Sequence, residues 1–267
     1  MKLFAENVLN REIEDSGYTQ LSVLSSSDID SLLKTYKEST VEVFDGFHPT
    51  MFHQNLAYRK AMNNCILQIL NERLSAIISS SFHLLYGNYM VKEPGSNSKM
   101  KLHQDWTYVD ENNYRSYAVW IPLLDLNEEN GAFSVIPKSH HLNNLIRGPG
   151  TSCPLAVCEN DLISKFGKSL YLKAGEAVFW DHKLGHYSPP NLSDVPRIAI
   201  TAIIVPKETP ILHYFKEQES NEIAEYLVNE TFYMDYNIGQ APSLPKNKIL
   251  EEKKVTLTMI DFKNLLE

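Results

Sequence analysis

Two residues with metal-binding side chains, His103 and Asp105, are separated by a single glutamine. Residues two apart on an extended chain share a face, so a strand here would direct the imidazole and the carboxylate into the same small volume. Together they supply two of the three ligands in the 2-His-1-carboxylate site, which holds non-haem Fe(II) and leaves other coordination positions open. A His-x-Asp triplet is also common by chance, so this interpretation requires a second histidine and a scaffold that brings all three together.

Residues 179–188 offer two histidines for the remaining position. His182 and His186 are four apart, a spacing that on a helix would place both on one face. Gly185 and the prolines at 189–190 argue against a helix, so we expect one of the two histidines, and not both, to complete the site. The spacing alone leaves the choice open.

Arg197 begins an apolar, β-branched run that ends at Val205. An arginine whose head lies inside a barrel needs an anion, because an unpaired buried charge is unfavourable. A guanidinium group binds a carboxylate through two parallel hydrogen bonds, which makes a dicarboxylate co-substrate its natural partner. The hydroxyl of Ser188 could add a further bond to the same carboxylate.

Short strands after a helical start are the elements that must position these groups. Residues 1–80 are predicted to be helical, with one helix following the serines at 25–27 and a longer one over 57–79. Residues 140–168 are predicted to be irregular, with 148–150 forming a loop at the active site. This pattern predicts a mainly β protein with flanking helices, whose core is a β-barrel or jelly roll. Besides the segment around His103, the predicted strands are 82–91, 117–126, 132–136, 170–172, 177–180 and 197–205.

The pattern weakens after Pro206. Residues 219–230 are predicted to be helical and residues 237–245 to form a loop. We expect one domain over residues 1–267, with helical support from 1–80, a jelly-roll core over 81–206 and a lid or wall from 207–267.

Composition limits the partners that this chain is expected to have. Of its 267 residues, 43% are apolar and 22% are charged, which is ordinary for a globular protein. A formal net charge of −8 disfavours nucleic acid and anionic membranes as partners and indicates little else. Three cysteines without metal-type spacing and an N-terminus without an apolar signal core predict a cytoplasmic protein in a reducing compartment.

Several motifs together resemble the phytanoyl-CoA dioxygenase superfamily over roughly residues 10–206. In the second of its iron-binding motifs, a serine follows the histidine by two positions and an arginine follows it by eleven, which matches His186 and not His182. The resemblance implies a double-stranded β-helix, a cupin-like jelly roll, that binds Fe(II) and 2-oxoglutarate and uses O2. The matching segments are 15–18, 103–105, 120–125, 129–131, 137–140 and 186–188, with Asn191, Ser193 and Arg197.

The resemblance also implies a role for each site residue. It assigns the iron to His103, Asp105 and His186. It assigns the distal carboxylate of 2-oxoglutarate to Arg197, with Ser188 beside it. Relatives that halogenate lack the carboxylate, so Asp105 favours hydroxylation and leaves desaturation open. Further co-substrate contacts are expected from Gln104, Trp120, Tyr86 and Asn88.

The implied reaction hydroxylates an unactivated C–H bond and releases succinate and CO2, with ascorbate as the reductant for assays in vitro. The superfamily acts on phytanoyl-CoA, on ectoine, and on many free amino acids and natural products. We expect a small polar metabolite, such as an amino acid or a natural-product intermediate, from this range and from four polar side chains: Tyr108, Arg147, His213 and Tyr233. Three alternatives remain open: an acyl-CoA or carrier-bound acyl substrate, a metal-binding jelly roll that is not an oxygenase, and a non-catalytic barrel.

Overall fold

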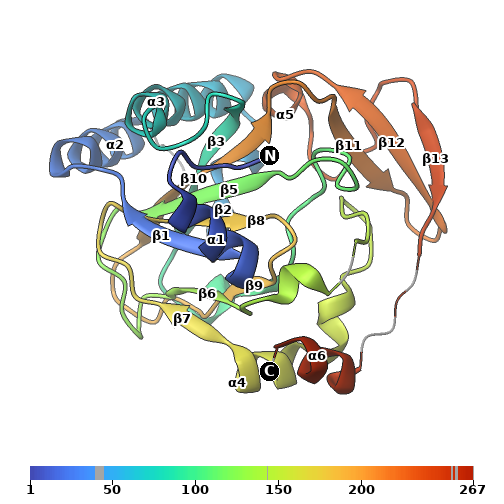
Figure 1. The fold of residues 1–267 in the computed structure, drawn as a ribbon. Coiled ribbons are helices and arrows are strands. Elements are labelled where there is room, and N and C mark those ends of the chain that lie inside the picture. The colour runs from blue at the N-terminus through green and yellow to red at the C-terminus, as the bar shows by residue number, and fades with distance from the viewer. Residues whose placement is uncertain (40–44, 143, 254, 256–257, 267) are drawn as a thin grey trace.

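Two antiparallel β-sheets form a jelly roll at the centre of the molecule (Figure 1). The computed structural model describes residues 1–39, 45–142, 144–253, 255 and 258–266. The larger sheet has the strand order β1-β8-β5-β10-β3-β2, and the smaller sheet has the order β4-β9-β6-β7. The larger sheet consists of β1 (Tyr18–Ser22), β2 (Phe47–Pro49), β3 (Phe82–Lys92), β5 (Tyr117–Pro122), β8 (Glu176–Asp181) and β10 (Arg197–Pro206). The smaller sheet consists of β4 (Met100–His103), β6 (Phe133–Val135), β7 (Lys168–Leu170) and β9 (His186–Ser188).

Strand β10 lies inside the larger sheet and is buried along its whole length. Its β-branched residues suit a strand that packs on both faces. Ile198 and Ile200 pack into a core shared with the helices, whereas Ile203 belongs to the core inside the roll. Thr201 pairs with Asn88 on one side and with Trp120 on the other. The strand therefore separates a helix-covered face from a face that lines the interior.

Helices cover the outer face of the larger sheet. They are α1 (Asn7–Ser16), α2 (Ser26–Ser39) and α3 (Leu56–Leu74), and α2 and α3 lie side by side (Figure 1). The side chain of Asn55 caps α3 by accepting hydrogen bonds from the backbone N–H groups of Ala57 and Tyr58. Ile66, Leu70 and other residues of α3 spaced by four pack against the sheet.

The C-terminal part of the chain adds a third sheet with the order β11-β12-β13. Its strands are β11 (Ile211–Lys216), β12 (Glu222–Val228) and β13 (Lys248–Glu251). The remaining helices are α4 (Glu159–Phe166), α5 (Phe232–Asp235), α6 (Met259–Leu266) and the short 3-10 helices η1 (Thr50–Phe52), η2 (Ser96–Ser98), η3 (Ser139–His141) and η4 (Pro154–Cys158). Arg59 of α3 is buried and donates a hydrogen bond to the carbonyl oxygen of Tyr236 at 2.6 Å, which ties this part to the helical layer.

The jelly roll confirms the predicted fold class, but several predicted elements are wrong. Residues 1–80 are not all helical, because β1 and β2 join the two edges of the larger sheet. Residues 219–230 contain β12 and not a helix, because pairing with β11 and β13 overrides local helix propensity. Residues 140–168 contain α4, and the strand predicted over 117–126 ends at Pro122.

Throughout the described part of the chain, no helix combines the length and the apolar character needed to cross a membrane.

Candidate active site

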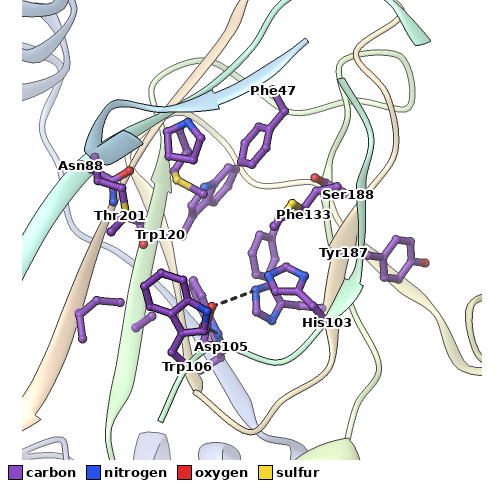
Figure 2. A pocket seen from close by; sticks show the side chains of 18 of the residues that line it. Phe47, Asn88, His103, Asp105, Trp106, Trp120, Phe133, Tyr187, Ser188 and Thr201 are labelled. Carbon is purple, nitrogen blue, oxygen red and sulfur yellow. Dashed lines mark hydrogen bonds and ion pairs between the residues drawn. The ribbon is translucent and has the colours of Figure 1, made fainter. Parts of the chain in front are cut away.

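Strand pairing brings His103, Asp105 and His186 together at one end of the smaller sheet. His103 at the end of β4 lies opposite His186 at the start of β9. Asp105 follows β4, where its backbone N–H donates to the carbonyl oxygen of His182 at 3.0 Å. One ligand atom from each of the three side chains lies within 4.8 Å of the other two. Figure 2 shows His103 and Asp105 directed into the same pocket.

Both imidazole rings are oriented by backbone carbonyl groups. Nδ1 of His103 lies 2.8 Å from the carbonyl oxygen of Lys101, and Nδ1 of His186 lies 3.0 Å from that of Leu184. A carbonyl oxygen only accepts hydrogen bonds, so in each ring Nδ1 carries a proton and Nε2 is the nitrogen that remains for a metal. Burial, followed by the nearby His186, lowers the pKa of His103 to about 4, so its ring is neutral at pH 7. In this orientation each ring directs Nε2, and not Nδ1, to the position where a metal could bind.

The carboxylate of Asp105 has one oxygen held by an indole group. Trp180 donates from Nε1 to Oδ2 at 2.8 Å, while Oδ1 lies 3.7 Å from Nε2 of His186. Burial would raise the pKa of Asp105, but His186 and the other nearby imidazoles lower it below its ordinary value. Asp105 is therefore ionised, with Oδ1 on the side of the imidazole.

His182 takes a different position from His186. Its Nδ1 lies 2.7 Å from the hydroxyl oxygen of Ser116, and the residue is fully buried. Its backbone carbonyl oxygen accepts a hydrogen bond from the N–H group of Asp105 and so positions that residue. The sequence spacing did not decide between His182 and His186. In the structure, His186 is the one that lies beside His103 and Asp105.

Arg197 is a buried cation without an acidic partner among the described residues. It is 2% exposed, and its Nε has no hydrogen-bond partner. Its guanidinium carbon lies 5.0 Å from the centre of the Trp120 ring. Burial lowers the pKa of Arg197 to about 9, the direction expected for a cation that lacks a counter-ion. An anionic ligand would remove this penalty.

The other predicted co-substrate residues line the same cavity, which has a volume of about 190 Å³. Oδ1 of Asn88 and Oε1 of Gln104 are buried and have no hydrogen-bond partner among the described residues. The hydroxyl groups of Tyr86 and Tyr108 bond to each other at 2.6 Å. The cavity residues predicted from the sequence, beyond the three that cluster, are Tyr86, Asn88, Gln104, Tyr108, Trp120, Ser188 and Arg197.

Lys92 supports Ser188 from outside the cavity. It is fully buried, and its Nζ donates to the carbonyl oxygens of Ser98, Ser188 and Pro189 at 2.6, 3.2 and 2.6 Å. Burial, followed by the charge of Arg197, lowers the pKa of Lys92 to about 6, and the three carbonyl oxygens accept the hydrogen bonds that its amine donates. This residue fixes the end of β9, on which Ser188 is mounted.

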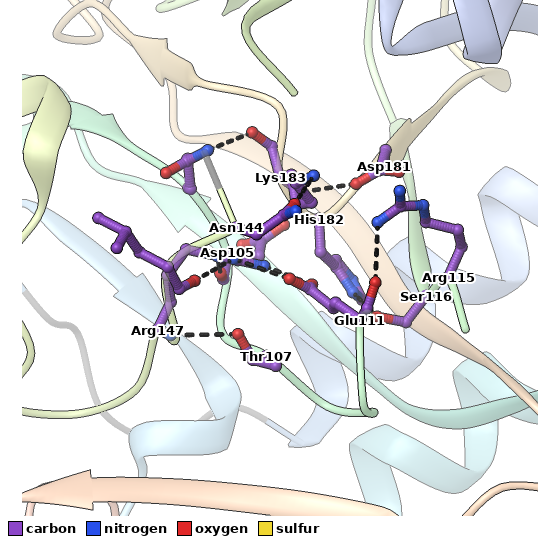
Figure 3. Close-up of polar contacts among 12 residues, drawn as sticks. Asp105, Thr107, Glu111, Arg115, Ser116, Asn144, Arg147, Asp181, His182 and Lys183 are labelled. Carbon is purple, nitrogen blue, oxygen red and sulfur yellow. Dashed lines mark hydrogen bonds and ion pairs between the residues drawn. The ribbon is translucent and has the colours of Figure 1, made fainter. Parts of the chain in front are cut away.

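Three residues predicted to contact the substrate do not line the cavity. Arg147 is paired with Glu111 and donates from Nε to the carbonyl oxygen of Asp105 at 2.6 Å (Figure 3). The ring of His213 lies buried within an aromatic cluster, 4.9 Å from the ring of Tyr236. Tyr233 packs behind Tyr86, with ring centres 5.0 Å apart. We therefore withdraw Arg147, His213 and Tyr233 as substrate contacts, and Tyr108 remains.

Several cavity residues were missed. Met90 and Thr201 could have been found, because each lies at an even spacing from a predicted residue on its strand. Residues 47–52 carry no such signal, since only the pairing of β2 with β3 brings them to the site. The missed residues are Phe47, Pro49, Met51, Phe52, Met90, Met100, Trp106, Ala118, Phe133, Trp180, Tyr187, Thr201 and Ile203.

Comparison with known proteins identifies relatives of this chain. The family model of phytanoyl-CoA dioxygenase (PhyH) matches residues 25–199. Phytanoyl-CoA dioxygenase domain-containing protein 1 of Danio rerio is 30% identical over 135 residues, which are 48% of this chain and 46% of that protein. Its homolog from Dictyostelium discoideum is 24% identical over 60% of this chain and 57% of the relative. The chain thus spans about half the length of the curated relatives that it matches.

Solved structures share the fold at low sequence identity. The α-ketoglutarate-dependent carbocyclase SnoK from nogalamycin biosynthesis has a TM-score of 0.55 at 19% identity, over 77% of this chain and 86% of SnoK. HygX from Streptomyces hygroscopicus, solved with nickel and 2-oxoglutarate, has a TM-score of 0.57 at 14% identity, over 76% of this chain and 88% of HygX. These structures show the fold alone, whereas the family match over residues 25–199 shows that the chain belongs to the phytanoyl-CoA dioxygenase family.

Proposed function

We propose that this protein is an Fe(II)- and 2-oxoglutarate-dependent dioxygenase. One observation carries the proposal: a cluster of two imidazoles and a carboxylate shares a cavity with a buried arginine that has no acidic partner in the described chain. Such a donor set suits non-haem Fe(II), and such an arginine suits a carboxylate. Membership of the phytanoyl-CoA dioxygenase family supports the same assignment.

The cluster fits a single metal ion in spacing and in protonation. Two atoms bound to one ion at about 2.1 Å lie roughly 3 to 4 Å apart. Oδ1 of Asp105 and Nε2 of His186 are separated by 3.7 Å, and the whole set spans at most 4.8 Å. In this proposal His103, Asp105 and His186 hold Fe(II), and the ionised carboxylate offsets part of its charge.

The residues around Arg197 fit 2-oxoglutarate. The guanidinium group would bind the distal carboxylate, and Ser188 and Trp120 line the same cavity. The amide groups of Asn88 and Gln104 provide neutral polar atoms in the same cavity. Binding of the dianion would satisfy a buried charge that the described residues leave without a partner.

When bound, Fe(II) and 2-oxoglutarate would supply the oxidising chemistry with O2, which yields succinate, CO2 and a hydroxylated product. The chain itself orients these groups and keeps water away. Carbonyl oxygens set the tautomers of His103 and His186, and the indole of Trp180 fixes the carboxylate of Asp105. The apolar walls of the cavity limit access of water to the site.

The residues that line the cavity bear on the kind of substrate this dioxygenase would accept. The sequence favoured a small polar metabolite, partly because of Arg147, His213 and Tyr233. None of these three side chains lines the cavity, so they do not support a polar substrate. Tyr108 does line it, with its hydroxyl already bonded to that of Tyr86.

A succinate-release assay tests the proposed activity. Protein with Fe(II), ascorbate, 2-oxoglutarate and O2 is screened against free amino acids, acyl-CoAs, aromatic compounds and natural-product precursors. We expect O2-dependent succinate formation that His103→Ala and Asp105→Ala abolish. Two exposed residues provide matched controls, His141→Ala and Asp194→Asn. Unchanged turnover in the first two variants, or turnover that continues without O2, would overturn the proposal.

A further inference from the structure

The cavity has a wall of apolar residues from four separate segments. Phe47 and Pro49 come from β2, Met90 from β3, Met100 from β4, and Trp106 from the chain that follows Asp105. Figure 2 shows Phe47 and Trp106 among the side chains that line the cavity. Two residues of η1 extend it, Met51 and Phe52. Phe52 is 46% exposed and marks the rim of the cavity.

Charge in the cavity is confined to the groups already assigned. Among the lining residues that the structure describes, the ionisable side chains other than tyrosines are His103, Asp105, His186 and Arg197. The first three would hold the metal, and Arg197 would hold 2-oxoglutarate. A substrate would therefore find no further charged partner in the cavity.

The polar groups that remain are neutral, and several of them are already bonded. The hydroxyl group of Thr201 donates to the carbonyl oxygen of Val119 at 2.9 Å, and the hydroxyl groups of Tyr86 and Tyr108 bond to each other. The amide nitrogen of Gln104 donates to the carbonyl oxygen of Lys183. The lining also includes the amide group of Asn88, the hydroxyl group of Ser188 and the indole N–H groups of Trp106 and Trp120, and because all of these are neutral, none can neutralise a carboxylate or an ammonium group.

From this distribution we infer that the molecule oxidised by this enzyme presents a neutral, apolar group to the metal, and that any charge it carries stays outside the rim at Phe52. The inference rests on the proposed function, because it assigns Arg197 to the co-substrate. An ammonium or carboxylate group buried here would lose its hydration without gaining a group of opposite charge. A free amino acid, whose two charges lie beside its α-carbon, does not fit this description.

Methionines make the apolar wall adaptable. Met51, Met90 and Met100 carry flexible, polarizable thioethers that fill irregular space and favour contact with aromatic rings. Aromatic rings from Phe47, Trp106 and Phe133 complete the surroundings. This wall suits hydrocarbon or aromatic groups of more than one shape.

Tryptophan fluorescence provides a direct readout of this cavity. The chain contains three tryptophans, and all of them, Trp106, Trp120 and Trp180, line it. The probes are three molecules with the same hydrocarbon part: 4-phenylbutan-1-ol, 4-phenylbutan-1-amine and 4-phenylbutanoate. Titrations use the full chain with Ni(II) and 2-oxoglutarate present, so that Asp105 and Arg197 are occupied. The cationic amine is the decisive comparison, since Arg197 cannot attract it.

We expect the alcohol to bind at least roughly tenfold more tightly than the amine or the carboxylate. Phe47→Ala and Phe52→Ala should each weaken alcohol binding about three- to tenfold, through lost apolar contact. Phe52 is partly exposed, so this variant tests the wall even if Phe47→Ala fails to fold. Leu192→Ala, at an apolar residue that is 67% exposed and outside the cavity, should leave binding unchanged.

Equal or tighter binding of the amine, or no fluorescence response to the alcohol, would overturn the inference. The two proposals fail in different ways. Absence of succinate formation together with selective binding of the alcohol would overturn the proposed function alone. Succinate formation by a protein that binds all three probes equally would overturn the substrate class alone.

Discussion

The two carboxylate oxygens of Asp105 have different partners. Oδ2 accepts a hydrogen bond from the indole of Trp180, which leaves Oδ1 on the side of His186. Partners of this kind, outside the direct ligands, orient a ligand and tune its affinity for the metal. Trp180 is thus a positioning residue for the proposed iron site.

Replacing Trp180 with phenylalanine should weaken metal binding while the ring volume is largely kept. Loss of such an outer partner typically reduces metal affinity by about 10- to 100-fold. Titration with Mn(II), followed by the paramagnetic signal of the free ion, measures the affinity. The exposed Tyr171→Phe serves as the control. If Trp180→Phe binds Mn(II) as tightly as the wild type, the hydrogen bond from the indole does not affect metal affinity.

Replacing Arg197 with leucine should raise the requirement for 2-oxoglutarate. Truncating one partner of a buried charged pair costs about 2–5 kcal/mol, which corresponds to a loss of affinity of at least about 30-fold. Arg197→Lys should fall between leucine and the wild type, because lysine keeps the charge but not the two parallel bonds. Calorimetric titration of 2-oxoglutarate into the Ni(II)-loaded protein measures the effect, with the exposed Arg11→Leu as the control. If Arg197→Leu binds normally, the arginine has a structural role only.

Among the loops and strands, the pair of Arg147 and Glu111 holds the segment that carries Asp105. Their side chains are 5% and 9% exposed, and Arg147 also donates to the carbonyl oxygens of Asp105 and Leu145 (Figure 3). A loop arginine that the sequence suggested for the substrate therefore supports the backbone beside the metal site.

Arg147→Met should lower the free energy of unfolding by about 3–5 kcal/mol, because it leaves the carboxylate of Glu111 buried without its partner. The double variant Arg147→Met, Glu111→Gln should recover part of this loss. Denaturant titration measures both. The matched control is Lys173→Met, which breaks the exposed ion pair of Lys173 with Asp125 and should change stability little. Equal effects of Arg147→Met and Lys173→Met would contradict the structural role of the buried pair.

Asp28 and Arg73 join the start of α2 to α3, and this contact should respond to pH. Two hydrogen bonds from Arg73, at 2.8 and 3.0 Å, outweigh burial and lower the pKa of Asp28 from 3.8 to about 2. Because the folded pKa lies below the unfolded one, the contribution is complete above about pH 4 and is lost as the pH falls towards 2.

Asp28→Asn should therefore be less stable than the wild type at pH 7, and the difference should shrink between pH 4 and pH 2. Denaturant titrations at a series of pH values test this expectation. Asp30→Asn, at an exposed position of the same helix, is the control and should show no such trend. A difference that stays constant down to pH 2 would show that the ion pair is not its source.

Considering the molecule as a whole, the sequence predicted the jelly roll but not its edges. The strong strands, such as β10, have apolar runs that identify them locally. β1 and β2 are short, and they exist because they pair with β8 and β3 at the edges of the larger sheet. β12 is rich in residues that favour helices, and only its pairing within the third sheet makes it a strand.

The same distinction holds for the site. His103 and Asp105 are two residues apart, and the spacing from His186 to Arg197 forms a motif, so sequence patterns could find them. Phe47 and Phe52 reach the cavity only because β2 pairs with the distant strand β3, and no local sequence pattern predicts this pairing. Conversely, the sequence does not show that Glu111 sits beside Arg147 and occupies its guanidinium group.

Anaerobic binding of Fe(II) and 2-oxoglutarate tests the central claim most directly. The wild-type protein should bind one Fe(II) per chain, and adding 2-oxoglutarate should produce a visible metal-to-ligand charge-transfer absorption band. His186→Ala should lose both the metal and the band, whereas the exposed His141→Ala should keep them. A wild-type protein that shows no such band, or a His186→Ala variant that retains it, would contradict the account.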